Sequence, residues 1–281
     1  MLRRARESME TKVEVRHPTR SFTVPSNFLG RVTMDLVNNL GAATLFFSKA
    51  FIRIFRPKQF SEIVLQVYHI GARSTNIVLF VGLFTGMVLG LQLYYTLSKF
   101  GSEGLLGSVI SLAIIRELGP VLAAIMITAR AGSSMAAEIG ILRISEQIDA
   151  LYSMRIDPVR YLISPRIAAS IISFPLLTAF FDLIGILGGY LTGVVLLGAS
   201  GGTYFSRVQS SIDLVDVRGG FIKSFVFAII VSTICCYQGY FTHMRTNSHG
   251  AKSVSLSTTS AVMLSCMTIL IADYVVTSFL M

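Results

Sequence analysis

Long segments without charged side chains are the feature that most constrains this chain. Residues 74–98 form a run of 25 uncharged residues. A helix of that length, at about 1.5 Å per residue, covers the roughly 30 Å of a bilayer's hydrocarbon core. Similar apolar segments follow at residues 104–129, 167–197, 221–240 and 253–280. Because only 14% of the 281 residues are charged, the sequence predicts an all-α integral membrane protein with five transmembrane helices.

The N-terminal region is too basic to cross a membrane. Residues 1–27 form a basic tail, whose charge leaves no room for the apolar core of a signal peptide. Residues 28–58 combine apolar side chains at helical spacing with five basic ones, Arg31, Lys49, Arg53, Arg56 and Lys58. We therefore expect a loosely ordered cytoplasmic tail, followed by an amphipathic helix that lies in the headgroup plane.

The distribution of Lys and Arg predicts which side of the membrane each loop faces. Five spans place the two termini on opposite sides. The side of the N-terminus carries 19 Lys and Arg residues, and the other side carries 4. Since these residues gather in cytoplasmic segments, the N-terminus is expected in the cytoplasm and the C-terminus in the periplasm. This placement also explains the net charge of +9 without nucleic-acid binding.

Residues 130–166 form a charged segment between the second and third spans. Within it, residues 144–158 fit a short amphipathic helix, with Ser145 as N-cap and Pro158 as its end. Its apolar face would hold Ile144, Ile148, Leu151 and Tyr152. A structured segment of this kind suits a transporter driven by a separate soluble motor. The alternative is a solvated loop that only joins two spans.

Motifs for catalysis are absent from the sequence. It contains no GxxxxGK[ST], GxSxG, HExxH or CxxC. The cysteines Cys235, Cys236 and Cys266 lie in apolar runs and are interpreted as packing residues, and the four histidines form no i, i+4 pair. We therefore expect neither an enzyme nor a metal site, so an ATPase driving transport would be a separate subunit.

Charged residues inside the apolar spans invite two interpretations. Arg116 and Glu117 each cost about 2.5–3.5 kcal/mol in the middle of a span, so they either approach a lipid headgroup or pair with other helices. Asp182 and Asp273 are expected to serve packing or to lie near the interface, rather than to relay protons. Two GxxxGxxxG repeats, at residues 82–90 and 185–193, predict close helix packing.

Four stretches carry a family resemblance: GMVLGLQ at 86–92, IRELGPVLAA at 115–124, ARAGSSMAAEIGILRISEQIDAL at 129–151, and DPVRYLISPR at 157–166. Together they resemble the MlaE-type permeases, membrane subunits of ABC transporters that work with MCE proteins to move phospholipid. Residues 28–281 would then form one permease domain in the bacterial inner membrane. The resemblance implies a homodimer, two cytoplasmic ATPase subunits that bind ATP and Mg, a hexameric periplasmic MCE protein, and room for a small cytoplasmic accessory subunit. It implies no cofactor in this chain.

The resemblance also implies roles for individual residues. The positions matching the family's ATPase-coupling segment are Glu138, Arg143, Glu146, Gln147, Asp149 and Leu151. Those matching its lipid pocket at the dimer interface are Leu89, Gln92, Thr96, Leu97, Phe100 and Leu118, and those matching its charged positions are Arg116, Glu117 and Lys223. Two other functions stay open. One is a proton-coupled secondary transporter using Glu117, Asp182 or Asp273, and the other is a structural anchor for a periplasmic complex.

Overall fold

Five long helical stretches account for most of the part of the chain that the structure describes, residues 60–244 and 250–280 of a computed structural model. Each is long and apolar enough to cross a membrane: Phe60–Lys99, Glu103–Ile144, Val159–Leu196, Leu214–Tyr240 and Ala251–Leu280. These residues contain no strand. The prediction of an all-α integral membrane protein is confirmed. The tail at 1–27 and the interfacial helix at 28–58 lie outside the described residues.

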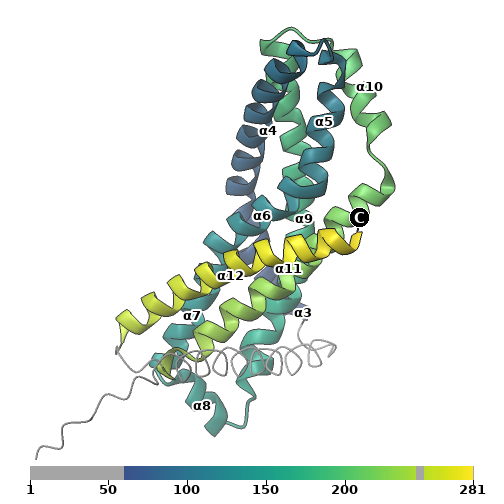
Figure 1. The fold of residues 1–281 in the computed structure, drawn as a ribbon. Helices are drawn as coiled ribbons and strands as arrows, with labels where there is room; N and C mark the ends of the chain where they lie inside the picture. The colour runs from purple at the N-terminus through teal and green to yellow at the C-terminus, as the bar shows by residue number, and fades with distance from the viewer. Residues whose placement is uncertain (1–59, 245–249, 281) are drawn as a thin grey trace, which may run out of the picture. The chain divides into compact units, whose positions relative to one another are not determined.

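Several spans consist of α-helices joined end to end by short π-helical or 3-10 turns (Figure 1). The α-helices are α3 Phe60–Val67, α4 Arg73–Lys99, α5 Leu106–Ala113, α6 Gly119–Ile127, α7 Ser133–Ile144, α8 Gln147–Ser153, α9 Ser164–Tyr190, α10 Gly201–Ser211, α11 Leu214–Tyr240 and α12 Ala251–Leu280. The π-helical turns are η2 Tyr68–Ala72, η4 Ile114–Leu118, η5 Thr128–Gly132, η6 Val159–Ile163 and η7 Leu191–Leu196, and the 3-10 turns are η3 Glu103–Leu105 and η8 Thr242–Met244.

The second and third spans extend into the charged segment at residues 130–166, which the sequence analysis placed outside the membrane spans. The second continues as α7 to Ile144, and the third begins at Val159. Arg166 of α9 is almost buried and pairs with Glu138 of α7, with Nη2 and Oε2 3.0 Å apart. Because these charges neutralise each other between helices, they do not end the helices as isolated charges would.

The two glycine repeats pack against each other, and their contact joins α4 to α9 (Figure 1). A Cβ on Gly86 would overlap the carbonyl oxygen of Gly185, and one on Gly90 would lie 3.0 Å from that of Gly189. The two backbones therefore touch directly, which only residues without side chains permit.

The helix α8 forms, but the predicted cap and end are wrong. Ser145 Oγ donates back to the carbonyl of Ile141 at 2.8 Å, so it does not cap α8. The N-cap is Glu146, in the left-handed conformation with φ 58°. The helix ends at Ser153, before Pro158, and Arg155 is also left-handed. Two sharp backbone turns thus bound α8.

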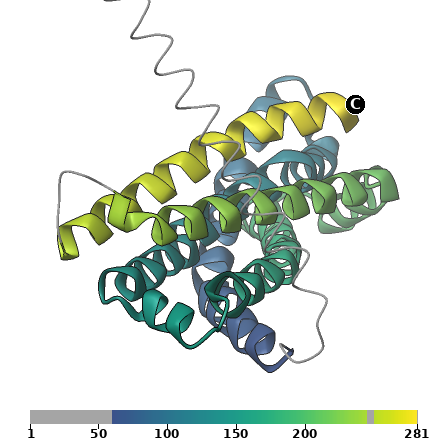
Figure 2. The same ribbon diagram turned by 90° about the horizontal axis from the view of Figure 1, so that it is seen from below.

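The remaining helices complete the bundle. The helix α10 was not predicted. It begins after Ser200 and buries Tyr204, whose hydroxyl donates to the carbonyl of Ile186 at 2.9 Å. The last two spans, α11 and α12, run side by side in both views (Figures 1 and 2). In Figure 1, α8 lies at the opposite end of the bundle from α10.

Candidate functional site

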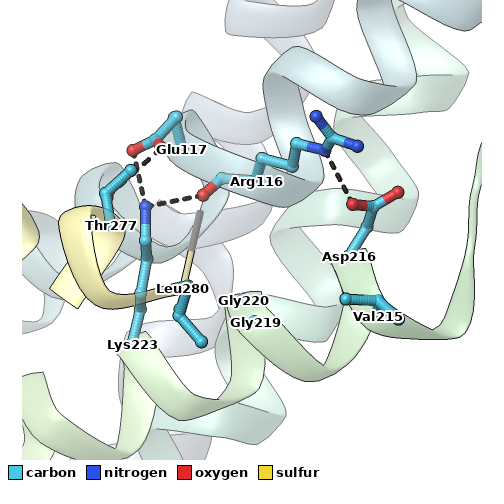
Figure 3. Close-up of a pocket in the computed structure, with 9 residues that line it drawn as sticks. All are labelled: Arg116, Glu117, Val215, Asp216, Gly219, Gly220, Lys223, Thr277 and Leu280. Carbon is cyan, nitrogen blue, oxygen red and sulfur yellow. Dashed lines mark hydrogen bonds and ion pairs between the residues drawn. The ribbon is translucent and has the colours of Figure 1, made fainter.

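Side chains from three spans line one pocket of about 210 Å³, and two of these spans contribute charged residues (Figure 3). Its walls come from η4 of the second span, the first turns of α11, and the last turn of α12. The lining residues are Arg116, Glu117, Val215, Asp216, Gly219, Gly220, Lys223, Thr277 and Leu280. Four charged residues of two spans thus meet at one place, although they lie far apart in the sequence.

A proline close to the pocket interrupts the backbone hydrogen bonding of the second span. Pro120 has no backbone N–H to donate to the carbonyl of Arg116, one turn earlier, and its ring crowds that carbonyl. The helix widens into the π-helical turn η4 just before it. Lys223 of α11 supplies the missing donor, because its Nζ lies 2.9 Å from the Arg116 carbonyl oxygen. A gap in the backbone hydrogen bonding of one span is thus filled by the side chain of another.

Lys223 is buried, with 2% of its side chain exposed, and is paired with carboxylates. Its Nζ lies 2.6 Å from Glu117 Oε2 and 3.1 Å from Asp273 Oδ1. The contact with Asp273 is an ion pair without a hydrogen bond, because Asp273 Oδ1 accepts no hydrogen bond from the described residues. Thr277 Oγ1 donates to the backbone carbonyl of Asp273 at 2.8 Å. One lysine therefore ties α11 to the second span and to α12.

Arg116 lines the pocket apart from the Lys223 group and pairs with a different carboxylate. Its Nε donates to Asp216 Oδ1 at 2.7 Å, and its side chain is 44% exposed. The other oxygen of Asp216 accepts the backbone N–H of Asp213 at 3.3 Å, which holds the carboxylate in the first turn of α11. The two terminal nitrogens of Arg116 make no hydrogen bond to the described part of the chain, and in Figure 3 the dashed line to Asp216 starts from Nε alone. These donors can bind an anion.

A second polar group lies at the other end of α11, around Arg143. Arg143 Nη1 is 2.7 Å from Asp149 Oδ1 of α8, and its Nε donates to His243 Nδ1 at 2.9 Å. Partial burial, followed by the Arg143 cation, lowers the pKa of His243 below its ordinary value. An unprotonated Nδ1 is what the Arg143 donor requires. This group joins α7, α8 and η8.

Comparison with known proteins assigns the chain to a family. Residues 63–279 match the family described as Permease MlaE. The chain belongs to the MlaE permease family. It is 41% identical over 253 residues to a "Probable ABC transporter permease protein" of Rickettsia bellii, covering 90% of this chain and 96% of that protein. It is 38% identical to the "Intermembrane phospholipid transport system permease protein MlaE" of Haemophilus influenzae, covering 90% and 95%.

A plant protein extends the similarity beyond bacteria. The chain is 35% identical over 229 residues to the chloroplastic protein TRIGALACTOSYLDIACYLGLYCEROL 1 of Arabidopsis thaliana, covering 81% of this chain and 64% of that protein. The family and the five spans together make the chain a multi-pass membrane protein.

In this MlaE-family chain, the residues matched to the lipid path fall into two groups. Arg116, Glu117 and Lys223 meet in the pocket. The other matched positions do not line it in a single copy of the described chain. Of these, Leu89 and Leu97 are half-buried on α4 and Leu118 is half-buried in η4, while Gln92, Thr96 and Phe100 are exposed.

The residues matched to ATPase coupling also divide. Arg143 and Asp149 pair with each other, and Glu138 pairs with Arg166. The other three lie on or beside α8, where Glu146 and Gln147 are exposed and Leu151 is half-buried. Charged members of this set therefore hold helices together as well as facing outward.

Sequence reasoning missed part of the pocket. It gave no role to Asp216 or Thr277. It expected Asp273 to serve packing or to lie near the interface and named no partner for it, whereas Asp273 pairs with Lys223. The spacing of these polar residues in the sequence could have revealed them. Asp213 and Asp216 lie three residues apart before an apolar run, and Asp273 and Thr277 lie four apart on one face of α12.

Proposed function

We propose that this chain is the permease subunit of an ATP-driven ABC transporter that moves phospholipid between the bacterial inner membrane and a periplasmic MCE protein. Membership of the MlaE family supports the proposal, as does similarity to a Haemophilus influenzae protein named for intermembrane phospholipid transport. The observation that carries it is Arg116, whose two terminal nitrogens remain available beside the pocket. A guanidinium suits the oxygens of a phosphate headgroup.

The chemistry of the pocket favours binding over catalysis. Its carboxylates are engaged by Lys223 and Arg116, so none is placed as a free base or nucleophile. Val215 and Leu280 add apolar surface next to the charges, as the junction of a headgroup and acyl chains requires. ATP and Mg would be bound by two separate ATPase subunits, and this chain would carry no cofactor.

A second copy of the chain would complete the lipid path. A pocket of about 210 Å³ is smaller than the roughly 300–1,000 Å³ that encloses a drug-sized ligand, and a phospholipid is larger still. Two copies about a twofold axis can enlarge it from one repeated surface. The exposed positions Gln92, Thr96 and Phe100 of each copy would line the shared cavity, together with Leu89, Leu97 and Leu118. A complex with one copy by native mass spectrometry would contradict this arrangement.

The α8 end is proposed as the cytoplasmic face, where the ATPase would contact Glu146, Gln147 and Leu151. A cysteine at Ser145, in a background without native cysteines, should react with a membrane-impermeant reagent only in inverted vesicles. A cysteine at Ser210 of α10 should react only in intact spheroplasts. The opposite labelling would reverse the orientation and remove the basis for placing the ATPase at α8.

Reconstituted transport tests the function itself. In proteoliposomes containing the ATPase, transfer of labelled phospholipid should require ATP hydrolysis. Arg116→Ala should slow it by about tenfold or more, the effect of losing one charge-assisted hydrogen bond to phosphate. Arg207→Ala removes an exposed arginine of α10 outside the pocket and should leave the rate unchanged.

The alternatives predict different results in the same assay. Transport that ignores ATP but stops when a protonophore collapses the proton gradient would identify a secondary transporter. The carboxyl of Asp182 makes this outcome worth testing, because its buried Oδ1 has no hydrogen-bond partner in the described residues. No transport under either condition, with the periplasmic complex still attached, would identify a structural anchor.

A further inference from the structure

The short helix α8 is attached to the spans by side chains from its inner face. Ile148 is completely buried and packs with Ile139 of α7, Ile167 of α9 and Cys236 of α11. The polar attachment to α11 is a hydrogen bond between the hydroxyls of Tyr152 and Tyr240, 2.7 Å apart. Motion of α8 therefore has a direct contact through which it can act on the last residue of α11.

Arg143 stabilises this attachment. It pairs with Asp149 of α8, and its guanidinium lies 5.6 Å from the centre of the Tyr240 ring. It also donates to His243, just beyond the end of α11. A planar cation over an aromatic face is favourable and restricts the ring. Tyr240 is thus held in place while its hydroxyl meets Tyr152.

The helix α11 is well suited to transmit a displacement. It is one α-helix from Leu214 to Tyr240, without an internal proline or a π-helical turn. The second span, in contrast, contains η4, Pro120 and η5 between the pocket and α7. Seventeen residues separate Tyr240 from Lys223, which corresponds to about 26 Å of continuous helix. A shift of Tyr240 along the axis should therefore reach Lys223.

At the pocket, a small shift of α11 changes which charges are paired. Lys223 on α11 contacts Glu117 and the Arg116 carbonyl on the second span at 2.6 and 2.9 Å. Hydrogen bonds of this length weaken steeply when the atoms move apart. Asp216, also on α11, holds Arg116. Both cations of the pocket thus depend on how α11 sits against the second span.

We infer that the Tyr152–Tyr240 hydroxyl pair is the joint that makes α11 follow α8, so that movement of α8 rearranges Lys223 and Arg116 at the pocket. This inference rests on the proposed function, in which an ATPase displaces α8. Tyr152 and Tyr240 are then positioning residues, which act on the lipid path without touching lipid. The second span is joined to α8 by the chain itself, whereas α11 is joined to α8 through side chains, among which the tyrosine pair supplies the direct hydrogen bond.

The test is a double-mutant cycle with Tyr152→Phe and Tyr240→Phe, which remove the hydroxyls and keep both rings. The phospholipid moved per ATP hydrolysed should fall by about fivefold in each variant, the size expected for one hydrogen bond. The double variant should be no worse than either single one, because both lose the same bond. The ATPase should copurify in all cases. Tyr161→Phe, at an exposed tyrosine whose hydroxyl makes no hydrogen bond within the described residues, serves as control.

A second readout follows the pocket directly. A cysteine at Gly219 would line the pocket, where an added Cβ meets only Leu280 Cδ1 at 3.7 Å. Its labelling rate should change when ATP is added, and this change should disappear in the Tyr→Phe variants. An unchanged coupling ratio and an unchanged labelling response in those variants would overturn the joint. A wild-type complex that transports without ATP, or binds no ATPase, would instead overturn the proposed function and the inference with it.

Discussion

Lys223→Met is expected to abolish transport and to reduce the stability of the folded chain more than any other single charge removal in the pocket. The substitution leaves Glu117 and Asp273 without the Lys223 cation, and it removes the hydrogen bond from Lys223 to the Arg116 carbonyl. Removing one partner of a buried ion pair costs about 3–5 kcal/mol. The measurement is the thermal unfolding midpoint in detergent, together with the yield of folded protein.

Matched variants separate the cause from a general effect of losing a lysine. Lys252→Met removes an exposed lysine at the start of α12 and should leave the unfolding midpoint unchanged. Neutralising the carboxylates as well, in Lys223→Met with Glu117→Gln and Asp273→Asn, should recover part of the stability without restoring transport. If Lys223→Met alone unfolds at the wild-type temperature, the pairing shown in Figure 3 does not stabilise the fold.

Gly86→Ala should be the second most damaging change, although it adds only one methyl group. The new Cβ would overlap the carbonyl oxygen of Gly185, and a backbone atom cannot rotate away as a side chain can. The cost should reach the upper end of the roughly 1–3 kcal/mol typical of overpacking. A lower unfolding midpoint and a reduced yield of folded protein should reveal it.

Gly202→Ala is the control for this prediction. Gly202 lies in the first turn of α10, and an added Cβ there meets nothing within 4 Å. Alanine also has the higher helix propensity, so this variant should be as stable as the wild type or slightly more stable. Equal stability of the Gly86 and Gly202 variants would show that α4 and α9 are able to separate without loss.

The existence of the five spans was predictable, but their limits were not. Uncharged runs of sufficient length point to spans wherever they occur. The rule fails at their ends, because charges such as Glu138 and Arg166 stay within helices once each has a partner. The Ser145 cap was wrong for a similar reason, since a serine can also bond back to the preceding turn.

The pocket was only partly predictable. Family motifs pointed to Arg116, Glu117 and Lys223, but the hydrogen bond from Lys223 to the Arg116 carbonyl joins residues 107 apart in the chain. No periodicity within one segment reveals such a partner. The glycine repeats likewise predicted a close approach without indicating that each repeat faces the other.

The contact between these repeats limits how α4 can move along α9. Because the carbonyl oxygens of Gly185 and Gly189 leave no room for a Cβ at Gly86 or Gly90, no residue with a side chain can replace these glycines against α9. Glycines meet glycines again only after four residues, a step of about 6 Å. We therefore expect the first and third spans to keep their register and to move together as one unit.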